Sequence, residues 1–355
     1  MFLTLVMVFG SVQAAAQGLT VIDLAGREVR MDKKPSRIVC LAPGTLRLIL
    51  YLQAKDLVVG VEAIETRFPT TRPYWLAHDD LGRLPIVGPG GVGTINAMPD
   101  LEAVLAARPE LVFISYLDGA KADRLSRTLS IPVVVLSYGE FGSFDDRLYE
   151  SLRVAGKVLG KEDRAEEVVA FIHSCQADLG RRTGGIPEDE KPWAYVGGIG
   201  WKGTQGLEST DADYAPFAWV GARNVAAGGG KSGHVFVDRE QLLAMDPDVI
   251  FLDGGGNSVI VDDIRKNPRY YGRLKAFRSQ RVYGLHTFNW YMTNIGTVIA
   301  DAYAVGTVLH PERFSDLNLQ ETADRIYTFL LGKPLHFVLA ERSGPLGQPL
   351  DLGGP

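Results

Sequence analysis

The sequence predicts an α/β protein of two Rossmann-like lobes with mainly parallel sheets, joined by one long α-helix, with a ligand cleft between the lobes. Three observations support this fold class. Short apolar segments typical of buried strands alternate with helices in both halves of the 355-residue chain, and this alternation favours parallel sheets. A long helical segment lies between the halves. One helix–turn–strand pattern occurs once in each half.

The first residues differ from the rest of the chain. Residues 2–12 (FLTLVMVFGSV) are apolar, and small residues follow at 13–17. This pattern predicts a secretory signal peptide over residues 1–16 and export to the periplasm of a Gram-negative cell. The apolar run is too short to span a membrane. The Lys or Arg expected before the run is missing, which indicates a start codon further upstream. A buried N-terminal strand or helix is the alternative.

Composition limits the classes of partner. The net charge is −5, so no basic excess is available to bind nucleic acid, and we expect a monomer. The chain has two cysteines, Cys40 in a predicted strand and Cys175 on the long helix. We expect both to be buried free thiols, although an exported protein could also form a disulfide.

The first lobe is predicted over residues 19–143. A small hairpin (19–29) precedes the first core strand (37–41), and Pro43 and Gly44 open a helix at 45–52. Further strands are expected at 57–61, 84–87, 111–115 and 133–137, and helices at 101–107 and 120–129. Residues 67–78 read as irregular, and residues 88–93 form a glycine-rich loop.

The helical connector is predicted over residues 144–185, with a break at Gly160. Its second part carries one apolar stripe, formed by Ala165, Val168, Val169, Ile172 and Leu179. Acidic residues in the first turn and Arg181 and Arg182 in the last turn suit the helix dipole. A helix of this length spans about 30 Å, so it can act as a stiff link between two lobes.

The second lobe is predicted over residues 186–340. Strands are expected at 193–197, 249–252 and 282–284, and helices at 214–220, 238–245, 264–267, 270–276, 293–309 and 321–331. Residues 341–355 read as a flexible tail because they are rich in Gly and Pro. The internal repeat joins residues 100–114 to residues 238–252, which lie 138 positions further on without a gap. The two lobes are therefore expected to be two versions of one fold.

Candidate ligand-binding residues were chosen because ligands bind outside the carboxyl ends of parallel strands. Aromatic and hydrogen-bonding residues follow the predicted strands in both lobes, which suits a bulky ligand held by ring contacts and a few polar groups. The expected ligand-binding residues are Thr45, Arg67, Tyr116, Tyr138, Trp201, Lys202, Gln205, His286, Trp290 and Tyr291. The alternative is that these loop aromatics only cover the sheet ends.

No pattern of catalytic or metal-ligating residues stands out. The chain lacks G-x-S-x-G, H-E-x-x-H and C-x-x-C, and its six histidines are dispersed. Residues 198–203 match G-x-G-x-x-G, but a polar stretch follows where a dinucleotide-binding fold needs a helix. We therefore expect no enzyme activity, no cofactor and no bound metal, with a nucleotide-dependent two-domain enzyme as the alternative from another class.

Several segments resemble one family. They are residues 35–43 (PSRIVCLAP), 56–61 (DLVVGV), 159–161 (LGK), 222–225 (ARNV) and both repeat copies. In this order they resemble the periplasmic substrate-binding proteins of ABC importers for iron complexes, haem and cobalamin, the class with a single helical connector. The resemblance implies capture of a ligand between two lobes, a small closing motion, and delivery to an ABC permease in the inner membrane.

The resemblance also implies permease-docking positions, one near the first helix of each lobe, where the family commonly carries a surface glutamate. This chain has Arg47 at the first position, and Glu208 or Asp213 is available for the second. Docking by a matched acidic pair is therefore in question. Arg47 could instead face the cleft and attract an anionic ligand.

The ligand is expected to be an iron(III)-siderophore or similar metal chelate, with Arg67, Arg72 and Lys202 supplying charge for an anionic chelate. Three alternatives stay open. A molybdate- or tungstate-type oxyanion would use hydroxyls such as Thr45 and Ser115 with the glycine loops. Haem would take an axial Tyr116, Tyr138 or His286. A corrinoid is the third.

Overall fold

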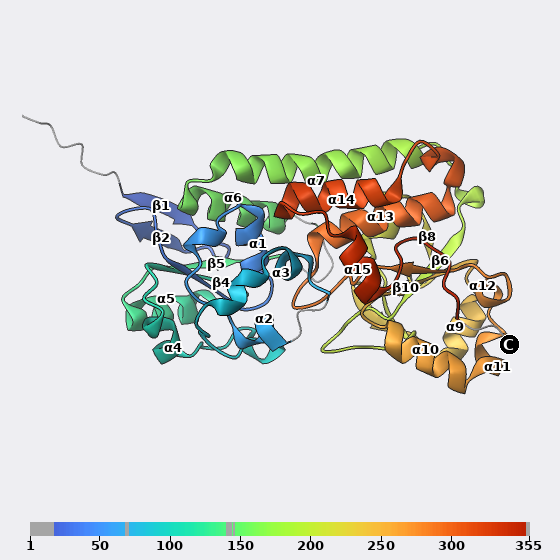
Figure 1. Cartoon of the computed structure of the whole chain (residues 1–355), viewed down its shortest axis with the longest axis horizontal. Helices are drawn as coiled ribbons and strands as arrows, with labels where there is room; N and C mark the ends of the chain where they lie inside the picture. Colours follow the sequence, from blue (N-terminus) through green and yellow to red (C-terminus); the bar gives the residue numbers. More distant parts are fainter. Residues whose placement is uncertain (1–17, 68–70, 140–143, 145, 353–355) are drawn as a thin grey trace, which may run out of the picture.

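Two α/β lobes lie side by side, and one long helix runs along both of them (Figure 1). The structure is a computed structural model that describes residues 18–67, 71–139, 144 and 146–352. The predicted fold class, two lobes with mainly parallel sheets, is confirmed. The predicted signal peptide lies outside the described residues.

The first lobe is built on a parallel sheet of three strands. Strand β4 (Leu111–Ser115) lies between β3 (Ile38–Leu41) and β5 (Val133–Leu136), with Cys40 opposite Phe113 and Phe113 opposite Val134. Every residue of these strands is buried, as expected for a sheet that helices cover on both faces. The hairpin of β1 (Leu19–Ile22) and β2 (Glu28–Met31) lies at the far end of this lobe (Figure 1).

Two predicted strands of this lobe, 57–61 and 84–87, are wrong as regular strands. They form single bridges instead, between Ile38 and Val58 and between Val61 and Ile86. A short helix, η1 (Lys55–Leu57), takes the start of the first segment, and Gly60 weakens its interior. The segment predicted as irregular, 67–78, starts at the last residue of α2 (Ala63–Arg67) and contains α3 (Pro73–Ala77), where a proline occupies the first helical position.

The second lobe has a parallel sheet in the order β11–β10–β6–β8. Its strands are β6 (Trp193–Gly197), β8 (Arg223–Asn224), β10 (Val249–Asp253) and β11 (Val282–Leu285). A separate antiparallel pair, β7 (Ser209–Asp211) and β9 (His234–Phe236), lies within segments that sequence reasoning left as loop. Strands β7, β8 and β9 have two or three residues each, too few for a periodicity to detect.

The internal repeat occupies equivalent places in the two lobes, as predicted. Helix α4 (Leu101–Ala106) leads into β4, and α9 (Arg239–Met245) leads into β10, which is likewise an interior strand. Both helices begin the same way, because the side chains of Asp100 and Asp238 accept a hydrogen bond from the backbone N–H three residues on. The two copies therefore share a cap, a helix and a central strand.

The remaining helices are short, apart from α5 and α10. They are η2 (Asp79–Arg83), η3 (Val92–Thr94), α5 (Gly119–Leu129), η4 (Glu188–Glu190), α8 (Ala215–Trp219), α10 (Asn257–Lys266), α11 (Pro268–Tyr271), α12 (Lys275–Arg278) and η5 (Pro311–Phe314). In the described part of the chain, no helix is long and apolar enough to cross a membrane. Cys40 and Cys175 are free and buried, as expected.

Within the predicted connector, residues 144–185, the helix that runs along both lobes is α7 (Glu162–Thr183) (Figure 1). The predicted break is present, since Gly160 has φ 66° and separates α7 from α6 (Asp146–Leu159). Helix α6 packs against β1 and against α1 (Thr45–Tyr51), so it belongs to the first lobe. The apolar stripe predicted for α7 is buried.

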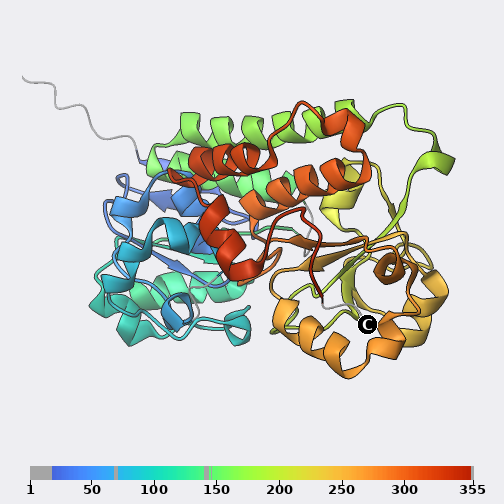
Figure 2. The same cartoon turned by 45° about the vertical axis from the view of Figure 1, so that its right-hand side comes forward.

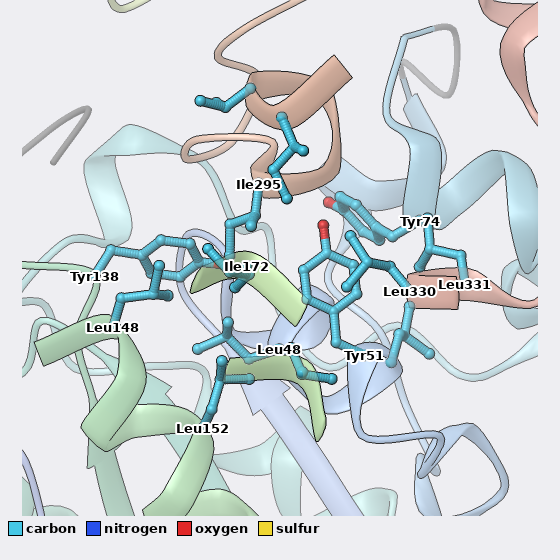
Figure 3. Close-up of a cluster of buried hydrophobic side chains, with 14 of the residues drawn as sticks. Leu48, Tyr51, Tyr74, Tyr138, Leu148, Leu152, Ile172, Ile295, Leu330 and Leu331 are labelled. Atoms are coloured by element: carbon cyan, nitrogen blue, oxygen red, sulfur yellow. The ribbon is translucent and has the colours of Figure 1, made fainter. Parts of the chain in front are cut away.

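Two further helices join the lobes. Helix α13 (Ile295–Leu309) packs along α7 and α8, and α14 (Leu319–Leu331) returns to contact α1 and α3 of the first lobe. Figure 2 shows both helices beneath α7. Their buried side chains form one core that spans the lobes (Figure 3): Leu48, Tyr51 and Tyr74 from the first lobe, Ile172 from α7, and Ile295, Leu330 and Leu331 from the C-terminal third.

The prediction of a flexible tail over residues 341–355 is wrong for residues 341–352. Helix α15 (His336–Ser343) extends into this region, and Leu346 is 2% exposed. The Leu350 N–H donates to the Val282 carbonyl and the Gly284 N–H to that of Gln348, so the tail pairs with β11. The Gly and Pro content of this segment reflects the turns that it makes along the edge of the sheet.

Candidate ligand-binding site between the lobes

One segment of the second lobe reaches across to the first. Residues 288–294, here called the crossing segment, lie between β11 and α13. The Arg47 guanidinium on α1 donates to two of its carbonyls, Thr293 at 2.7 Å from Nη1 and Trp290 at 3.0 Å from Nη2. Arg47 is therefore a direct link between the lobes.

A second link is made by Tyr291. Its hydroxyl donates to Glu62 Oε2 at 2.6 Å and accepts from the Gly91 N–H at 3.1 Å, both in the first lobe. Tyr291 and Met292 have φ of 52° and 82°, left-handed values that are unfavourable for residues with a side chain. Such backbone concentrates at functional sites, where neighbouring contacts hold it.

Ring and sulfur contacts complete this interface. The Arg72 guanidinium lies 4.3 Å from the centre of the Trp290 ring. It is also paired with Glu65, whose carboxylate accepts from the Tyr74 hydroxyl at 2.7 Å. Beside them, the Tyr116 hydroxyl lies 3.6 Å from Met292 Sδ. Aromatic rings thus surround the polar contacts of the crossing segment.

Arg47 is a buried charge without a matching carboxylate. Its side chain is 0% exposed, and the hydrogen-bond partners of its guanidinium are neutral: backbone carbonyls and the Tyr138 hydroxyl at 3.4 Å. In the described part of the chain, Arg47 Nε and the Thr293 hydroxyl are buried without a hydrogen-bond partner. An unpaired buried charge is costly, so this arrangement favours an anion.

Glu62 lies at the same interface, directly after the bridge at Val61 and before α2. It is 5% exposed, and burial raises its pKa to about 7, although hydrogen bonds from Tyr291 and the Ala42 N–H favour the ionised form. Gly90, at φ 65°, folds the glycine-rich loop over it so closely that a Cβ there would lie 2.9 Å from the Glu62 Cβ. Position 90 therefore requires glycine, which lets the loop lie close enough to cover Glu62.

Two buried aspartates hold the base of the crossing segment. Asp253, at the end of β10, accepts from the Phe288 N–H at 2.6 Å, and Asp301 on α13 accepts from the His286 N–H at 3.0 Å. Burial raises the pKa of both carboxyl groups. The Asn294 amide adds a bond to the Thr287 carbonyl at 2.9 Å. The segment that reaches across is thus fixed at both ends.

The second-lobe loop predicted to bind ligand lies next to the crossing segment. The Asn289 amide donates to the Gly200 carbonyl at 2.6 Å, and Gln205 donates to the Trp201 carbonyl at 2.7 Å. Trp201 stacks on His234, with ring centres 4.5 Å apart and planes 6° from parallel. Lys202 is exposed. We call this loop the rim; the Asn289–Gly200 hydrogen bond joins it to the crossing segment.

The structure brings together four of the predicted ligand-binding residues, Tyr116, Tyr138, Trp290 and Tyr291, and places Trp201, Lys202 and Gln205 on the rim. Thr45 and His286 are not part of this group, because no described contact joins them to the crossing segment and their bonded atoms contact other parts of the protein. The Thr45 hydroxyl is used by the Leu41 carbonyl at 2.6 Å. His286 contacts the Tyr327 hydroxyl at 3.1 Å in the core, and burial lowers its pKa to about 3.

Arg67 is exposed at the end of α2 and has no described contact with the crossing segment.

Arg47 cannot dock to a permease as a surface charge, because it is buried between the lobes. The alternative, that it faces the cleft, fits its contacts. Glu208 is paired with Arg239 at 3.1 Å. Asp213 is exposed and accepts from the Ser232 hydroxyl at 2.7 Å. Sequence reasoning left Glu62 out of the site, although it follows a predicted strand.

Gly198 and Gly200 in the 198–203 motif allow close packing. A Cβ on Gly198 would lie 2.9 Å from Ile260 and 3.2 Å from Gly256, so two loops meet there. As expected, no helix follows this motif, and the chain runs on to β7. In the described residues, no group of three His, Cys, Asp or Glu side chains could hold a metal ion.

Two lobes of one fold, a helical connector and an interface closed by a crossing segment define a two-lobed binding protein. The chain belongs to the periplasmic binding protein family, whose sequence profile matches residues 38–287. It is therefore a solute-binding component of an ABC importer and not an enzyme, and it delivers a small ligand to a permease.

Individual relatives are distant. The molybdate-binding protein MolA of Haemophilus influenzae is 23% identical over 330 residues, 86% of this chain and 89% of that protein. Its molybdate-bound structure has a TM-score of 0.72 and covers 89% of this chain and 98% of that one, at 20% identity. A periplasmic solute-binding protein of Veillonella parvula has a TM-score of 0.74, also at 20% identity, covering 92% and 97%. An Fe(3+)-citrate-binding protein of Bacillus subtilis is 27% identical over 203 residues, 56% of this chain and 60% of that protein.

Proposed function

We propose that the ligand is a compact anion, a tetrahedral oxyanion such as molybdate or tungstate, held at the interface of the lobes beside Arg47. The observation that carries this proposal is the charge of the interface. Glu65 forms its salt bridge with Arg72 and acts on Arg47 only as a nearby charge, whereas Arg47 forms no salt bridge among the described residues. An anion would supply the missing charge, and Arg47 Nε and the Thr293 hydroxyl are buried groups able to bond it.

The size of the ligand follows from the contacts across the interface. Tyr291 and Arg47 already join the lobes at 2.6–3.0 Å. A bulky chelate in this place would have to break these links and part of the core shared by α1 and α14. A compact oxyanion needs only a small space beside them. The similarity to a molybdate-binding protein over most of both chains supports the same class.

A small anionic ferric chelate is the second candidate. The rim residues Trp201 and Lys202 favour it, because an exposed cation beside an aromatic ring suits a flat anionic ligand. The Fe(3+)-citrate-binding relative supports this class. Such a ligand would lie against the rim, further from Arg47 than the oxyanion. For a larger siderophore, haem or a corrinoid, the same contacts across the interface are an obstacle.

The proposed function also includes export to the periplasm and docking to the permease, which involve residues outside the binding site. Residues 1–16 act as a signal peptide that exports the protein to the periplasm, where it works as a monomer and passes its ligand to an inner-membrane permease. Asp213 is the exposed carboxylate among the three predicted docking residues, and it is proposed for the second-lobe contact.

The test is a calorimetric titration of the mature protein with molybdate, tungstate, sulfate, phosphate and ferric citrate. We expect saturable binding of molybdate or tungstate. Arg47→Met should weaken it at least about 30-fold, since removing one partner of a buried charge pair costs about 2–5 kcal/mol. Arg223→Met is the control, because Arg223 lies over Trp193, far from the crossing segment, and should keep wild-type affinity.

Two results would contradict the proposal. The absence of saturable binding for all four oxyanions would exclude a compact oxyanion. Equal affinity of wild type and Arg47→Met would remove Arg47 from the site. Binding of ferric citrate alone would favour the second candidate, and Lys202→Met should then weaken it more than Arg47→Met.

A further inference from the structure

Glu62 belongs to the first lobe, and a residue of the second lobe shields it from solvent. On its own lobe, the glycine-rich loop covers it through Gly90. From the opposite lobe, the Tyr291 hydroxyl closes the remaining side at 2.6 Å. Separation of the lobes would remove Tyr291 and leave Glu62 facing water. The environment of this one carboxyl group therefore depends on whether the lobes are closed.

The charged and titratable groups around Glu62 provide no cation. They are the Cys40 thiol on β3, the Glu65 carboxylate on α2 and the Tyr291 phenol from the second lobe. Glu65 is already paired with Arg72, and the guanidinium of Arg47 is directed to the carbonyls of the crossing segment. In closed lobes, an ionised Glu62 is stabilised by hydrogen bonds alone.

We propose that Glu62 is a proton-binding site coupled to closure: it takes up one proton from solvent when the crossing segment seals it, and returns that proton when the lobes open. This inference rests on the interface assigned above as the binding site, but it does not depend on which ligand binds there. The left-handed Tyr291 and Met292 fit a segment that is held in place by such a contact.

The direction of the pH dependence follows from the environment of Glu62. An exposed glutamate has a pKa near 4.5, and burial in the closed lobes raises it to about 7. Since the closed state binds the proton more tightly, closure is favoured as pH falls and is disfavoured as pH rises through 7. From pH 8.5 to pH 5.5, the ratio of closed to open protein should rise about 30-fold.

This coupling suits an anionic ligand. An ionised Glu62 would repel an anion bound next to Arg47, whereas a protonated Glu62 would not. Capture would then take up an anion together with a proton, and opening at the permease would release both. A neutral ligand would gain nothing from the same device.

The experiment uses ligand-free protein, so it is independent of the proposed ligand. Spin labels at Glu102→Cys on α4 and Asp262→Cys on α10, both exposed, report the distance between the lobes; Cys40 and Cys175 are buried. We expect the wild-type distribution to shift from short to long distances between pH 5.5 and pH 8.5. Glu62→Gln should reduce the change in the closed-to-open ratio to less than about threefold. Glu240→Gln, an exposed carboxyl on α9, should respond like wild type.

A wild-type distribution that does not change with pH, or an unchanged pH response in Glu62→Gln, would overturn the inference. If Glu62→Gln does not fold, the wild-type protein can be titrated by carbon-13 NMR with labelled glutamate. One carboxyl, identified by its shift in Tyr291→Phe, should then titrate near pH 7. A midpoint near 4.5 for that carboxyl would equally overturn the inference.

Discussion

The hydroxyl of Tyr291 offers a sharp test of how the lobes are held closed. Replacing Tyr291 with Phe keeps the ring in place and removes one oxygen atom. That oxygen makes two bonds across the interface, to Glu62 at 2.6 Å and from the Gly91 N–H at 3.1 Å. The same hydroxyl also interacts with the Thr94 side chain of the first lobe, so the change removes the contacts that this one oxygen makes across the interface.

The magnitude can be worked from these two bonds. A bond to an ionisable carboxyl contributes about 1.5–3 kcal/mol and a neutral bond about 0.5–1.5 kcal/mol. Water would replace both once the lobes open, so we expect a net loss of about 1–3 kcal/mol from the closed state. If the ligand binds closed protein, its affinity should fall about 5- to 150-fold.

The assay is a titration of wild type and Tyr291→Phe with the ligand found in the anion panel, together with guanidinium unfolding of both proteins. We expect weaker binding with the free energy of unfolding nearly unchanged, because the ring still fills its place. An affinity within twofold of wild type would refute the idea that this hydroxyl holds the lobes together. A loss of folding stability as large as the loss of affinity would mean that Tyr291 supports the fold instead of closure.

Two further predictions concern stability. Leu330 is fully buried where α14 meets the first lobe, so Leu330→Ala should lower the free energy of unfolding in urea by about 2–5 kcal/mol. Val259→Ala is the control: Val259 is 43% exposed, so the free energy of unfolding should change by less than about 0.5 kcal/mol. Asp301→Asn should raise the melting temperature at pH 9 more than at pH 6: burial raises the pKa of Asp301, so its ionisation removes stability as pH rises, and Asn does not ionise. An Asp301→Asn protein that is less stable than wild type at pH 9 would contradict this reasoning.

Much of the fold was predictable because its elements have local signals. The buried strands β4, β5, β6 and β10 are short apolar runs, and α7 carries an apolar stripe with suitably charged ends. The repeat was found because both copies use the same cap, helix and strand order. These features depend on residues close together in the chain, which periodicity and capping rules describe.

What could not be predicted depends on contacts between distant parts of the chain. Nothing local shows that α14 returns to the first lobe or that Leu346 enters the core. Arg47 shows what a sequence can indicate about a buried residue and what it cannot. It stands in an otherwise apolar seven-residue helix, TLRLILY, where all residues are buried. A lone arginine in such a helix signals a buried interaction, but its partners, more than 240 residues away, are visible only in the structure.

The same limit applies to the site. The rule that ligands lie beyond strand ends found Tyr116, Tyr138, Trp290 and Tyr291, which the structure gathers at one interface. It also selected Thr45 and His286, whose Oγ1 and Nδ1 atoms are hydrogen-bonded inside the protein. Position after a strand identifies the edge of the sheet, but it does not show which side chains turn inward.

The return of α14 to the first lobe affects how the chain can acquire its structure. Helix α1 packs not only on β3 and α6 but also on α14, which is encoded some 270 residues later. During synthesis, the apolar side chains of α1 therefore stay without their final cover until nearly the whole chain has been made. A C-terminal truncation before α14 would accordingly leave the N-terminal lobe incomplete. Its exposed apolar surface would make it aggregation-prone and a target for chaperones and proteases.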